Sequence, residues 1–558
     1  MDDLKGVFNE HKIAYFSMEI GLSNDIPTYA GGLGVLAGDT IRSSADLNLP
    51  IIALTLVSKK GFFNQHFDEN GWQIESYEEW DPSKYAELLE PEINLKIENR
   101  NVKVKAWLYK YYSFTKEMIP ILFLDTDFEE NEPKDREITH YLYGGDEKYR
   151  LKQEIVLGMG GARMIDALEL DIRKYHMNEG HSSLLTLELL HNYNMDGEKV
   201  RNLCVFTTHT PVKAGHDTFP YTLVEELFGD NEDIELLKKY SDSDKLDMTR
   251  LALNLSDYVN GVAKRHREIS KQMFPGYEIN TITNGVHTYN WTCSHFKQLY
   301  DEFVPGWAAE PELLVRASNI PYGRVWEAHN KAKKDLIDYV NEKTGKDMDY
   351  ETLTIGFSRR AAEYKRHSFI FTDLERLKKV NYKGNLQFIF AGKAHPRDEA
   401  GKKIIQNIFG YIKELEGQIK IAYLEDYDME LASKMVSGVD IWLNTPMRPY
   451  EASGTSGMKA AHNGVINFSV LDGWWIEGWI EGVTGWSIGP KSYEYSSEDK
   501  IAKQEIDDFY NKLEYIIIPT YYERRNDWIK MMSNSISMIA YYFNTHRMMR
   551  RYVTEAYL

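Results

Sequence analysis

Short apolar runs alternate with longer amphipathic stretches along most of the chain. Short apolar runs bounded by turn residues are typical of strands, and the stretches between them have the spacing of helices. Strands are predicted in the first half at 13–16, 51–54, 119–124 and 203–207. Strands are predicted in the second half at 353–357, 386–391, 420–424, 439–444 and 465–470. This alternation predicts an α/β protein with largely parallel sheets.

The two groups of predicted strands favour two Rossmann-like domains. A chain of 558 residues is also too long for a single hydrophobic core. Turn signals crowd together between residues 285 and 330, so we expect one domain over 1–300 and a second over 301–525. The segment 526–558 has a helical pattern, and by analogy with folds of this kind we expect its helices to cross back to the first domain.

The composition is that of an ordinary globular protein. Apolar residues make up 43% of the chain and aromatic residues 13%. The formal net charge of −19 argues against a general binder of nucleic acids or membrane surfaces, because both attract basic proteins. The two cysteines, Cys204 and Cys293, are too few for a disulfide framework or a cysteine zinc site.

No segment of the chain is typical of export or membrane insertion. Residues 1–5 lack an apolar signal core, and no uninterrupted apolar run is long enough to cross a bilayer. We therefore predict a cytoplasmic protein whose partners include neither nucleic acid nor membrane.

The segment from Arg448 to Lys459 is the strongest candidate for chemistry. Small residues fill most positions before the lone Lys459, so the backbone can approach a ligand closely and present its N–H groups. A desolvated lysine amine can condense with an aldehyde, and pyridoxal phosphate is an aldehyde that would also use a glycine-rich phosphate nest. A flexible glycine and serine loop with a solvated lysine is the alternative. The predicted strands on both sides favour the chemical interpretation.

The run from Glu451 to Lys459, followed by Asn463 and Gly464, resembles the cofactor-lysine segment of the α-glucan phosphorylases, the glycogen and maltodextrin phosphorylase family. The resemblance implies a GT-B type glycosyltransferase fold, in which two Rossmann-like domains face each other across a cleft. It also implies cleavage of α-1,4-glucans from the non-reducing end by inorganic phosphate. The product would be α-D-glucose 1-phosphate with retained configuration.

The same resemblance implies pyridoxal 5'-phosphate as the cofactor, bound to Lys459 as a Schiff base and contacted by Thr455 and Ser456. These enzymes use the cofactor through its phosphate group. Ser456 and Gly457 stand where the better-known members carry glycine and asparagine.

A second glycine-rich segment, 29–39, is predicted to open a helix. Unpaired N–H groups at a helix start favour an anion, although the spacing fits neither a Walker loop nor a dinucleotide fingerprint, and a tight structural turn is an equal alternative. By resemblance, Gly32 and Leu33 match the loop that faces the substrate phosphate. Synthases that use nucleotide sugars have a similar loop.

Four cations gather in the segment 357–366, at the end of a predicted strand. Open α/β sheets bind ligands at that end, so these cations predict a phosphate site. A solvated basic helix start is the alternative, but cations at a helix N-terminus oppose the macrodipole. By resemblance, Arg359, which is normally lysine, and Tyr427 would hold the cofactor phosphate. Arg360 and Lys365 would hold the substrate phosphate.

Several polar residues in turns could bond sugar hydroxyls. A single histidine is more often structural, and the histidine spacing predicts no metal site. By resemblance, His181 is a catalytic residue at the glucosyl unit, which Asn284 also binds, and His209 lines the catalytic cleft. The resemblance assigns further glucosyl contacts to Glu451, Ser453 and Gly454.

Other functions can be weighed against phosphorolysis. A nucleotide-sugar-dependent glycogen or starch synthase shares the fold but is not expected to carry the Lys459 segment. A non-catalytic glucan-binding relative could lose the phosphate-binding cations, which are retained here, and a hydrolase would need a distinct pair of carboxylates. We expect an α-1,4-glucan and inorganic phosphate as partners, and a homodimer stays open. The first predicted strand begins near Met1, so we expect no phosphorylated regulatory arm.

Overall fold

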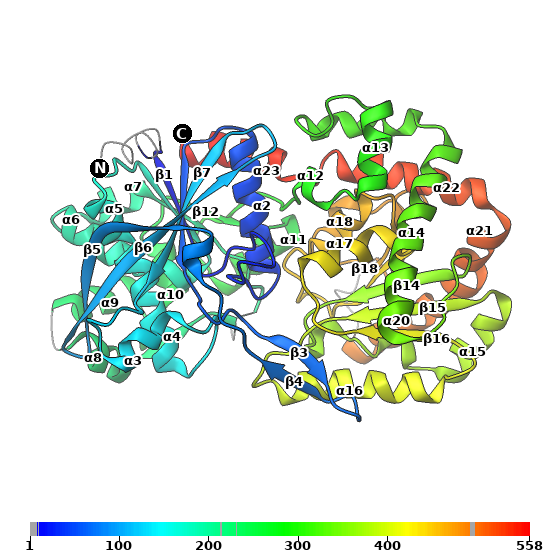
Figure 1. Cartoon of the computed structure of the whole chain (residues 1–558), viewed down its shortest axis with the longest axis horizontal. Helices are drawn as coiled ribbons and strands as arrows, with labels where there is room; N and C mark the ends of the chain where they lie inside the picture. The colour runs from blue at the N-terminus through cyan, green and yellow to red at the C-terminus, as the bar shows by residue number, and fades with distance from the viewer. Residues whose placement is uncertain (1–7, 9–10, 213–214, 230–231, 492–496) are drawn as a thin grey trace. The chain divides into compact units, whose positions relative to one another are not determined.

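A computed structural model describes the chain at residues 8, 11–212, 215–229, 232–491 and 497–558. It divides into two compact units, which we describe separately (Figure 1). The first unit consists of Met1–Phe63, Tyr77–Thr283 and Thr545–Leu558, and the second of Asn64–Ser76 and Asn284–Asn544. Each unit therefore includes a segment that the chain supplies from its other half. The functional domains predicted over 1–300, 301–525 and 526–558 stay a prediction.

The first unit is built on a nine-stranded sheet. Its order is β13-β12-β9-β8-β1-β2-β7-β6-β5. The strands are β1 (Ile13–Ser17), β2 (Ile51–Leu56), β5 (Glu87–Ile97), β6 (Arg100–Tyr112), β7 (Met118–Asp125), β8 (Lys174–Asn178), β9 (Cys204–Thr207), β12 (Tyr258–Gly261) and β13 (Asn280–Thr281). From β7 to β12 the strands are parallel and follow the order 3-2-1-4-5-6 of a Rossmann fold. Only β5 and β6 add antiparallel pairs.

Both faces of this sheet are buried, which explains why its central strands read as continuous apolar runs. Along β1, Ala14 and Phe16 join one hydrophobic cluster and Ile13 and Tyr15 join another, because successive side chains point to opposite faces. Helices α4 (Glu147–Ile155), α5 (Gly161–Ala167) and α6 (Leu185–Asn192) contribute to the first cluster. Helices α2 (Gly32–Asp46) and α23 (Thr545–Tyr552) contribute to the second.

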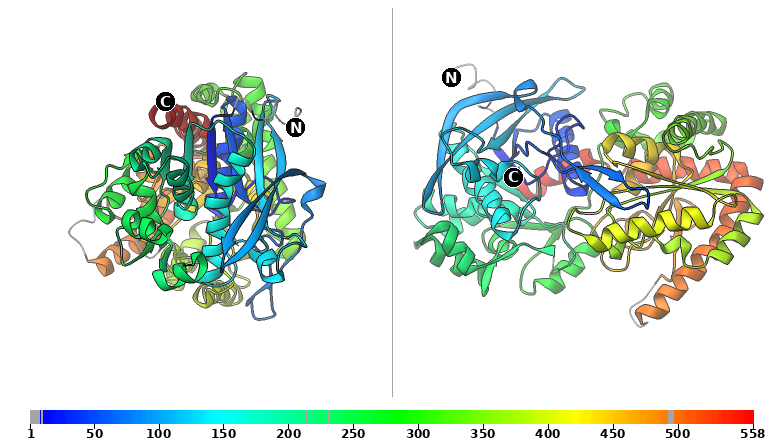
Figure 2. Two further views of the ribbon diagram at one scale, coloured as in Figure 1. Left: turned by 90° about the vertical axis from the view of Figure 1, so that its left-hand side faces the viewer. Right: turned by 60° about the horizontal axis from the view of Figure 1, so that its bottom comes forward.

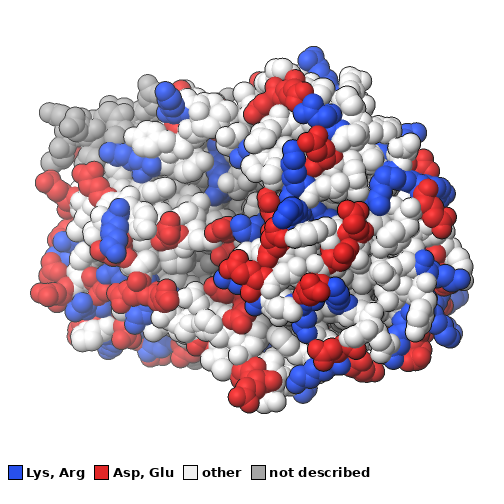
Figure 3. All heavy atoms as spheres, turned by 45° about the vertical axis from the view of Figure 1, so that its right-hand side comes forward, with Lys and Arg blue, Asp and Glu red and all other residues white. Residues whose placement is uncertain are grey.

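The remaining elements of the first unit are short. Its other helices are α3 (Pro133–Arg136), α7 (Gly197–Leu203), α8 (Tyr221–Phe228), α9 (Glu232–Ser241), α10 (Met248–Asn254) and α11 (Lys264–Met273), and a small hairpin joins β10 (Thr218–Pro220) to β11 (Lys245–Asp247). Within the described ranges, none of the helices has both the length and the apolar content of a membrane span. Acidic and basic side chains are interspersed over the face drawn in Figure 3.

The second unit contains a six-stranded parallel sheet in the order β16-β15-β14-β17-β18-β19. The strands are β14 (Leu353–Ser358), β15 (Leu386–Ala391), β16 (Lys420–Leu424), β17 (Ile441–Asn444), β18 (Ile466–Val470) and β19 (Gly485–Ile488). Counted from β14, this is again the order 3-2-1-4-5-6. All the strands predicted from the apolar pattern are confirmed in both units, as is the α/β class.

Helices cover this second sheet and supply much of its core. They are α12 (Thr288–Trp291), α13 (Ser294–Phe303), α14 (Tyr322–Thr344), α15 (Leu374–Lys383), α16 (Glu399–Glu414), α17 (Met429–Gly438), α18 (Ser456–Ala461), α19 (Trp475–Gly478), α20 (Glu498–Lys512), α21 (Ile518–Glu523) and α22 (Arg525–Asn534). A hairpin of β3 (Asn64–Phe67) and β4 (Gln73–Ser76) also belongs to this unit.

Each sheet reverses its strand order at one place. The reversal lies between β1 and β8 in the first unit and between β14 and β17 in the second. Ligands of open α/β sheets bind outside the carboxyl ends of the strands at such a switch point. The segments that follow these strands are therefore where functional side chains are expected.

Candidate active site

Three charged side chains meet where β14 and β17 end. Arg359 directly follows β14, Lys365 lies in a short 3-10 turn, and Glu451 lies in the segment after β17. Lys365 Nζ donates to both carboxylate oxygens of Glu451, at 2.8 and 3.0 Å. The Arg359 guanidinium donates to the same carboxylate. The fold thus brings together residues that the sequence assigned to the two phosphates and to the glucosyl unit.

These three side chains are shielded from solvent, so their charges act strongly on one another. Their exposures are 8% for Arg359, 10% for Lys365 and 7% for Glu451. Burial alone would raise the pKa of Glu451, but Arg359 and Lys365 outweigh it and lower that pKa to about 2. Two cations against one carboxylate leave a net positive charge, which attracts an anion.

Tyr427 lies beside this cluster, after strand β16. Burial raises the pKa of Tyr427 to about 12, while a hydrogen bond with Ser358 and the charge of Arg359 act in the opposite direction. Tyr427 and Arg359, both predicted to hold the cofactor phosphate, are therefore neighbours. Arg360 is exposed and is not part of the cluster around Glu451.

Lys459 lies in the short helix α18 and is buried, with an exposure of 7%. Its Nζ lies 3.8 Å from the centre of the Trp291 ring, and Trp291 is itself buried. The backbone N–H of Lys459 donates to Thr455 O at 3.2 Å. The amine is therefore desolvated and lies against an aromatic ring, and desolvation makes a lysine more reactive toward an aldehyde.

The two departures from the better-known pattern have a packing explanation. Ser456 Oγ accepts a hydrogen bond from Trp442 Nε1 at 2.9 Å, which ties the start of α18 to β17. A Cβ atom at Gly457 would lie 2.2 Å from Asn467 Oδ1 and 2.8 Å from the Trp474 ring. Glycine is therefore the residue that fits at 457, because the Asn467 side chain occupies the adjoining space.

The loop that contains Glu451, Ser453 and Gly454 is held by the segment after β18. Asp472 accepts hydrogen bonds from the backbone of Glu451 at 2.9 Å and of Gly473 at 3.0 Å, and Trp474 N donates to Ser453 O at 2.9 Å. Burial raises the pKa of Asp472 to about 7 despite these bonds. Sequence reasoning missed Asp472, although its position two residues after a predicted strand was a usable signal.

The residues of this unit fit a phosphorylated aldehyde cofactor. Among the described residues, Arg359 Nη1 and Asn444 Oδ1 are buried without a hydrogen-bond partner, and they lie at the ends of β14 and β17. A phosphate group could accept from the Arg359 guanidinium, which would satisfy this buried donor. The buried amine of Lys459 could attach such a cofactor covalently.

In the first unit, the glycine-rich loop leads from β1 into α2. The Glu19 carboxylate accepts from Ala30 N at 2.6 Å, from Gly31 N at 3.1 Å and from Tyr143 OH at 2.8 Å. Two N–H groups of the loop are therefore already used by Glu19, which sequence reasoning also missed. Gly32 is exposed and Leu33 is partly exposed, so the helix start that follows is open to a ligand.

His181 lies after β8, beside a buried charged group. Its Nε2 is 3.6 Å from Asp217 Oδ2, and Arg150 Nη2 donates to the same oxygen at 2.8 Å. Burial, helped by the charge of Arg150, lowers the pKa of His181 to about 3. Arg150 also pairs with Glu154, whose pKa is raised by burial and by Asp217. His181 is therefore neutral at pH 7 and can bond a hydroxyl group.

His209 follows β9 and is held from two sides. Its Nε2 pairs with Asn178 Oδ1 at 2.7 Å, and its backbone N–H donates to Glu179 Oε2 at 2.7 Å. Burial lowers the pKa of His209 to about 3. The structure thus places His181 and His209 beside the end of β8 in the first unit. Asn284 is buried in the second unit.

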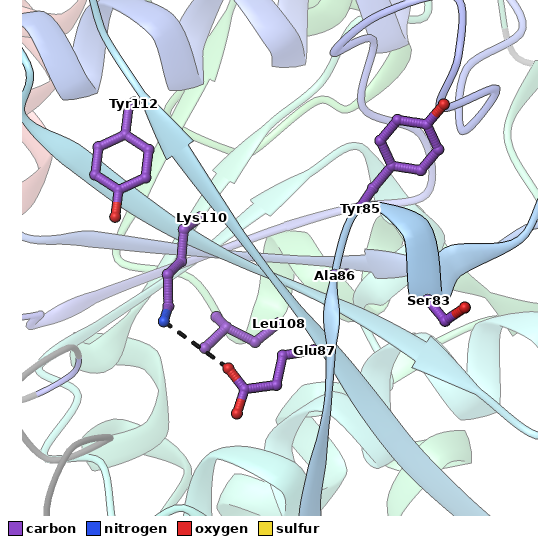
Figure 4. Close-up of a pocket in the computed structure, with 7 residues that line it drawn as sticks. All are labelled: Ser83, Tyr85, Ala86, Glu87, Leu108, Lys110 and Tyr112. Carbon is purple, nitrogen blue, oxygen red and sulfur yellow. Dashed lines mark ion pairs between the residues drawn. The ribbon is translucent and has the colours of Figure 1, made fainter.

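A pocket on the first unit contains none of the predicted site residues. It is lined by Ser83, Tyr85, Ala86, Glu87, Leu108, Lys110 and Tyr112, from β5, β6 and the turn before them (Figure 4). Lys110 and Glu87 form an ion pair there at 3.9 Å. This pocket lies on the antiparallel strands, away from the carboxyl ends of β1 and β8, so we do not assign the site to it.

Comparisons with known proteins point in one direction. A family model described as carbohydrate phosphorylase matches residues 212–483. Maltodextrin phosphorylase of Thermococcus litoralis is 42% identical over 98% of this chain and 70% of its own length. Glycogen phosphorylase of Aquifex aeolicus is 38% identical over 98% of this chain and 86% of its own length. An uncharacterized protein of Methanocaldococcus jannaschii is 32% identical over 98% of this chain and 99% of its own length.

Proposed function

The chain belongs to the carbohydrate phosphorylase family, and we infer from this that it is a glycosyltransferase that cleaves α-1,4-glucans with inorganic phosphate. The product is α-D-glucose 1-phosphate, released from the non-reducing end with retained configuration. The observation that carries the proposal is the buried cluster of Arg359, Lys365 and Glu451 at the switch point of the second sheet. This cluster is cationic and lies where α/β proteins bind anions.

Pyridoxal 5'-phosphate is the proposed cofactor, as is general in the family. Lys459 would hold it covalently, and Arg359, Ser358 and Tyr427 would hold its phosphate group. Support comes from the burial of Lys459 and from the unpartnered Arg359 Nη1. When bound, the cofactor supplies a phosphate group that acts as a proton partner for the substrate phosphate.

Lys365 is the proposed ligand of the substrate phosphate, assisted by the exposed Arg360. In the first unit, the helix start at Gly32 and Leu33 is proposed to bind phosphate. The positive charge orients the phosphate for attack and stabilises the negative charge that the phosphate gains as it donates a proton to the departing glycosidic oxygen. Because phosphate itself bonds to the sugar carbon, no carboxylate of the protein is needed as a nucleophile.

The proposed contacts with the glucosyl unit come from the backbone, from uncharged side chains and from the ion-paired Glu451. Glu451, Ser453, Gly454 and Asn284 would bind hydroxyl groups in the second unit, and His181 and His209 in the first. Both imidazoles are neutral at pH 7, so His181 can donate one hydrogen bond and accept another. The ring N–H of His209 is used by Asn178 Oδ1, so its other ring nitrogen is left as an acceptor. A homodimer and a cytoplasmic location stay predictions.

The test supplies purified protein with a maltodextrin and inorganic phosphate. We expect release of α-glucose 1-phosphate, and chain extension in the reverse direction with glucose 1-phosphate as donor. A Lys459→Ala variant provides the control, because it should lose both reactions. Extension from UDP-glucose or ADP-glucose without any use of glucose 1-phosphate would establish a synthase instead.

A further inference from the structure

The β3–β4 hairpin comes from the first half of the sequence but packs within the second unit. Its strands are inserted between Phe63 and Tyr77 of the first unit, but the hairpin belongs to the second unit. It lies beside helix α16 in Figure 1 and in the right-hand view of Figure 2. Its strands pair antiparallel, with Gln65 opposite Glu75 and Phe67 opposite Gln73.

Apolar and charged contacts fix the hairpin on the second unit. The Phe67 ring packs edge-on against Phe409 at 4.9 Å and against Tyr423 at 5.3 Å. Lys402 of α16 forms an ion pair with Glu75 at 3.0 Å. The hairpin is therefore anchored independently of the polar contacts described next.

Gln65 bonds two loops of the second unit at once. Its Nε2 donates to Gly392 O at 2.9 Å and to Gln73 Oε1 at 2.8 Å. Its Oε1 accepts from Asp426 N at 3.0 Å, and its own backbone N–H donates to Asp426 Oδ1 at 3.0 Å. The Gln65 side chain is fully buried, and its bonds to Gly392 and Gln73 form away from water.

Gln73 bonds the loop after β15, which is the loop that Gln65 contacts at Gly392. Its Oε1 accepts from Ala394 N at 2.9 Å and its Nε2 donates to Ala394 O at 2.9 Å, as a neighbouring strand would do. Gln73 is 1% exposed. The two amides thus form a bonded pair that spans residues 392–394 on one side and Asp426 on the other.

Both loops border the residues proposed to hold the cofactor phosphate. A Cβ atom at Gly392, whose φ is +137°, would lie 1.9 Å from Arg359 O, so the loop after β15 is in close contact with the Arg359 backbone. Ala361 N donates to Lys393 O at 2.9 Å. Asp426 pairs with Lys393 at 2.6 Å and directly precedes Tyr427. A shift of either loop would move Arg359 or Tyr427.

We propose that Gln65 and Gln73 are positioning residues for the cofactor phosphate, acting through the loops 392–394 and 426–427 that border Arg359 and Tyr427. This inference rests on the proposed function. The hairpin would thus support the phosphate site through the bonds of its two amides to these loops. Loss of the amide pair should weaken binding of the phosphate group more than binding of the pyridoxal ring.

The test compares two ligands on the full-length protein after removal of its cofactor. Gln73→Met and Gln65→Met replace each amide with an apolar side chain of similar length, and Ile74→Met, at a position 48% exposed on the same hairpin, is the matched control. Each protein is titrated with pyridoxal 5'-phosphate and with pyridoxal, followed by absorption, and the bound phosphate is observed by phosphorus NMR.

We expect each glutamine variant to bind pyridoxal 5'-phosphate about tenfold more weakly than the wild type, with pyridoxal binding unchanged and the phosphorus resonance shifted. The control should match the wild type. Equal weakening for both ligands would show a general loss of structure and would overturn the inference, as would unchanged binding of both. A wild-type protein that binds no pyridoxal 5'-phosphate would instead overturn the proposed function.

Discussion

Replacement of Lys365 by methionine tests the proposed substrate-phosphate site directly. Lys365 Nζ donates to both oxygens of Glu451, and its side chain is only 10% exposed. A solvent-exposed pair would be worth about 0–1 kcal/mol, because water and salt screen it. At this buried position the loss of a charge-assisted partner for a bound anion should cost about 2–4 kcal/mol, or about 30- to 900-fold in phosphate affinity.

The assay measures initial rates of phosphorolysis while phosphate and maltodextrin are varied in turn. We expect KM for phosphate to rise strongly in Lys365→Met, whereas KM for maltodextrin stays within about twofold of the wild-type value. The matched control is Lys403→Met, which removes an exposed lysine of α16. It should leave both values unchanged.

Two results would refute the reasoning. If Lys365→Met weakened phosphate and maltodextrin to the same degree while the melting temperature held, Lys365 would not distinguish the two ligands. Unchanged phosphate affinity would equally remove Lys365 from the site. A large fall in melting temperature would be expected only if the remaining Arg359 could not compensate the Glu451 charge, because an uncompensated buried carboxylate is strongly destabilising.

Three further predictions follow from the same unit. Borohydride reduction and peptide mapping should place a pyridoxyl group on Lys459, and an active wild-type protein without that adduct would contradict the cofactor assignment. The pKa of Asp472 is raised to about 7, so between about pH 4 and 7 the folded protein holds a proton that the unfolded chain releases. This group therefore lowers the free energy of unfolding as the pH rises from about 4 to 7. In denaturant titrations, the free energy of unfolding of Asp472→Asn relative to the wild type should therefore rise by about 1.4 kcal/mol per pH unit between about pH 4 and 7. A difference that does not change with pH would exclude the raised pKa of Asp472. Gly457→Ala should lower the free energy of unfolding by about 1–3 kcal/mol, because its Cβ would meet Asn467, and an unchanged thermal melt would contradict the packing argument.

The sequence by itself determined the class of fold and the family. The apolar runs of β1, β2, β7 and β9 and those of the second sheet are local signals, because a strand buried on both faces must be apolar throughout. The resemblance to α-glucan phosphorylases also depends on a local run, 451–459, and it is confirmed by the relatives that match 98% of the chain. The phosphate site at 357–366 is also predicted from a local signal, because its cations follow a predicted strand.

Only the tertiary structure decided which side chains meet. The pairing of Glu451 with Arg359 and Lys365 depends on β14 and β17 being neighbours, and strand order is not encoded in the apolar pattern of either strand. Asp472 reaches Glu451 for the same reason, through β18. Gln65 contacts Gly392 across 327 positions of sequence. Such contacts arise when chain segments far apart in sequence bury a common surface, so residues whose role is to position others leave little local signal.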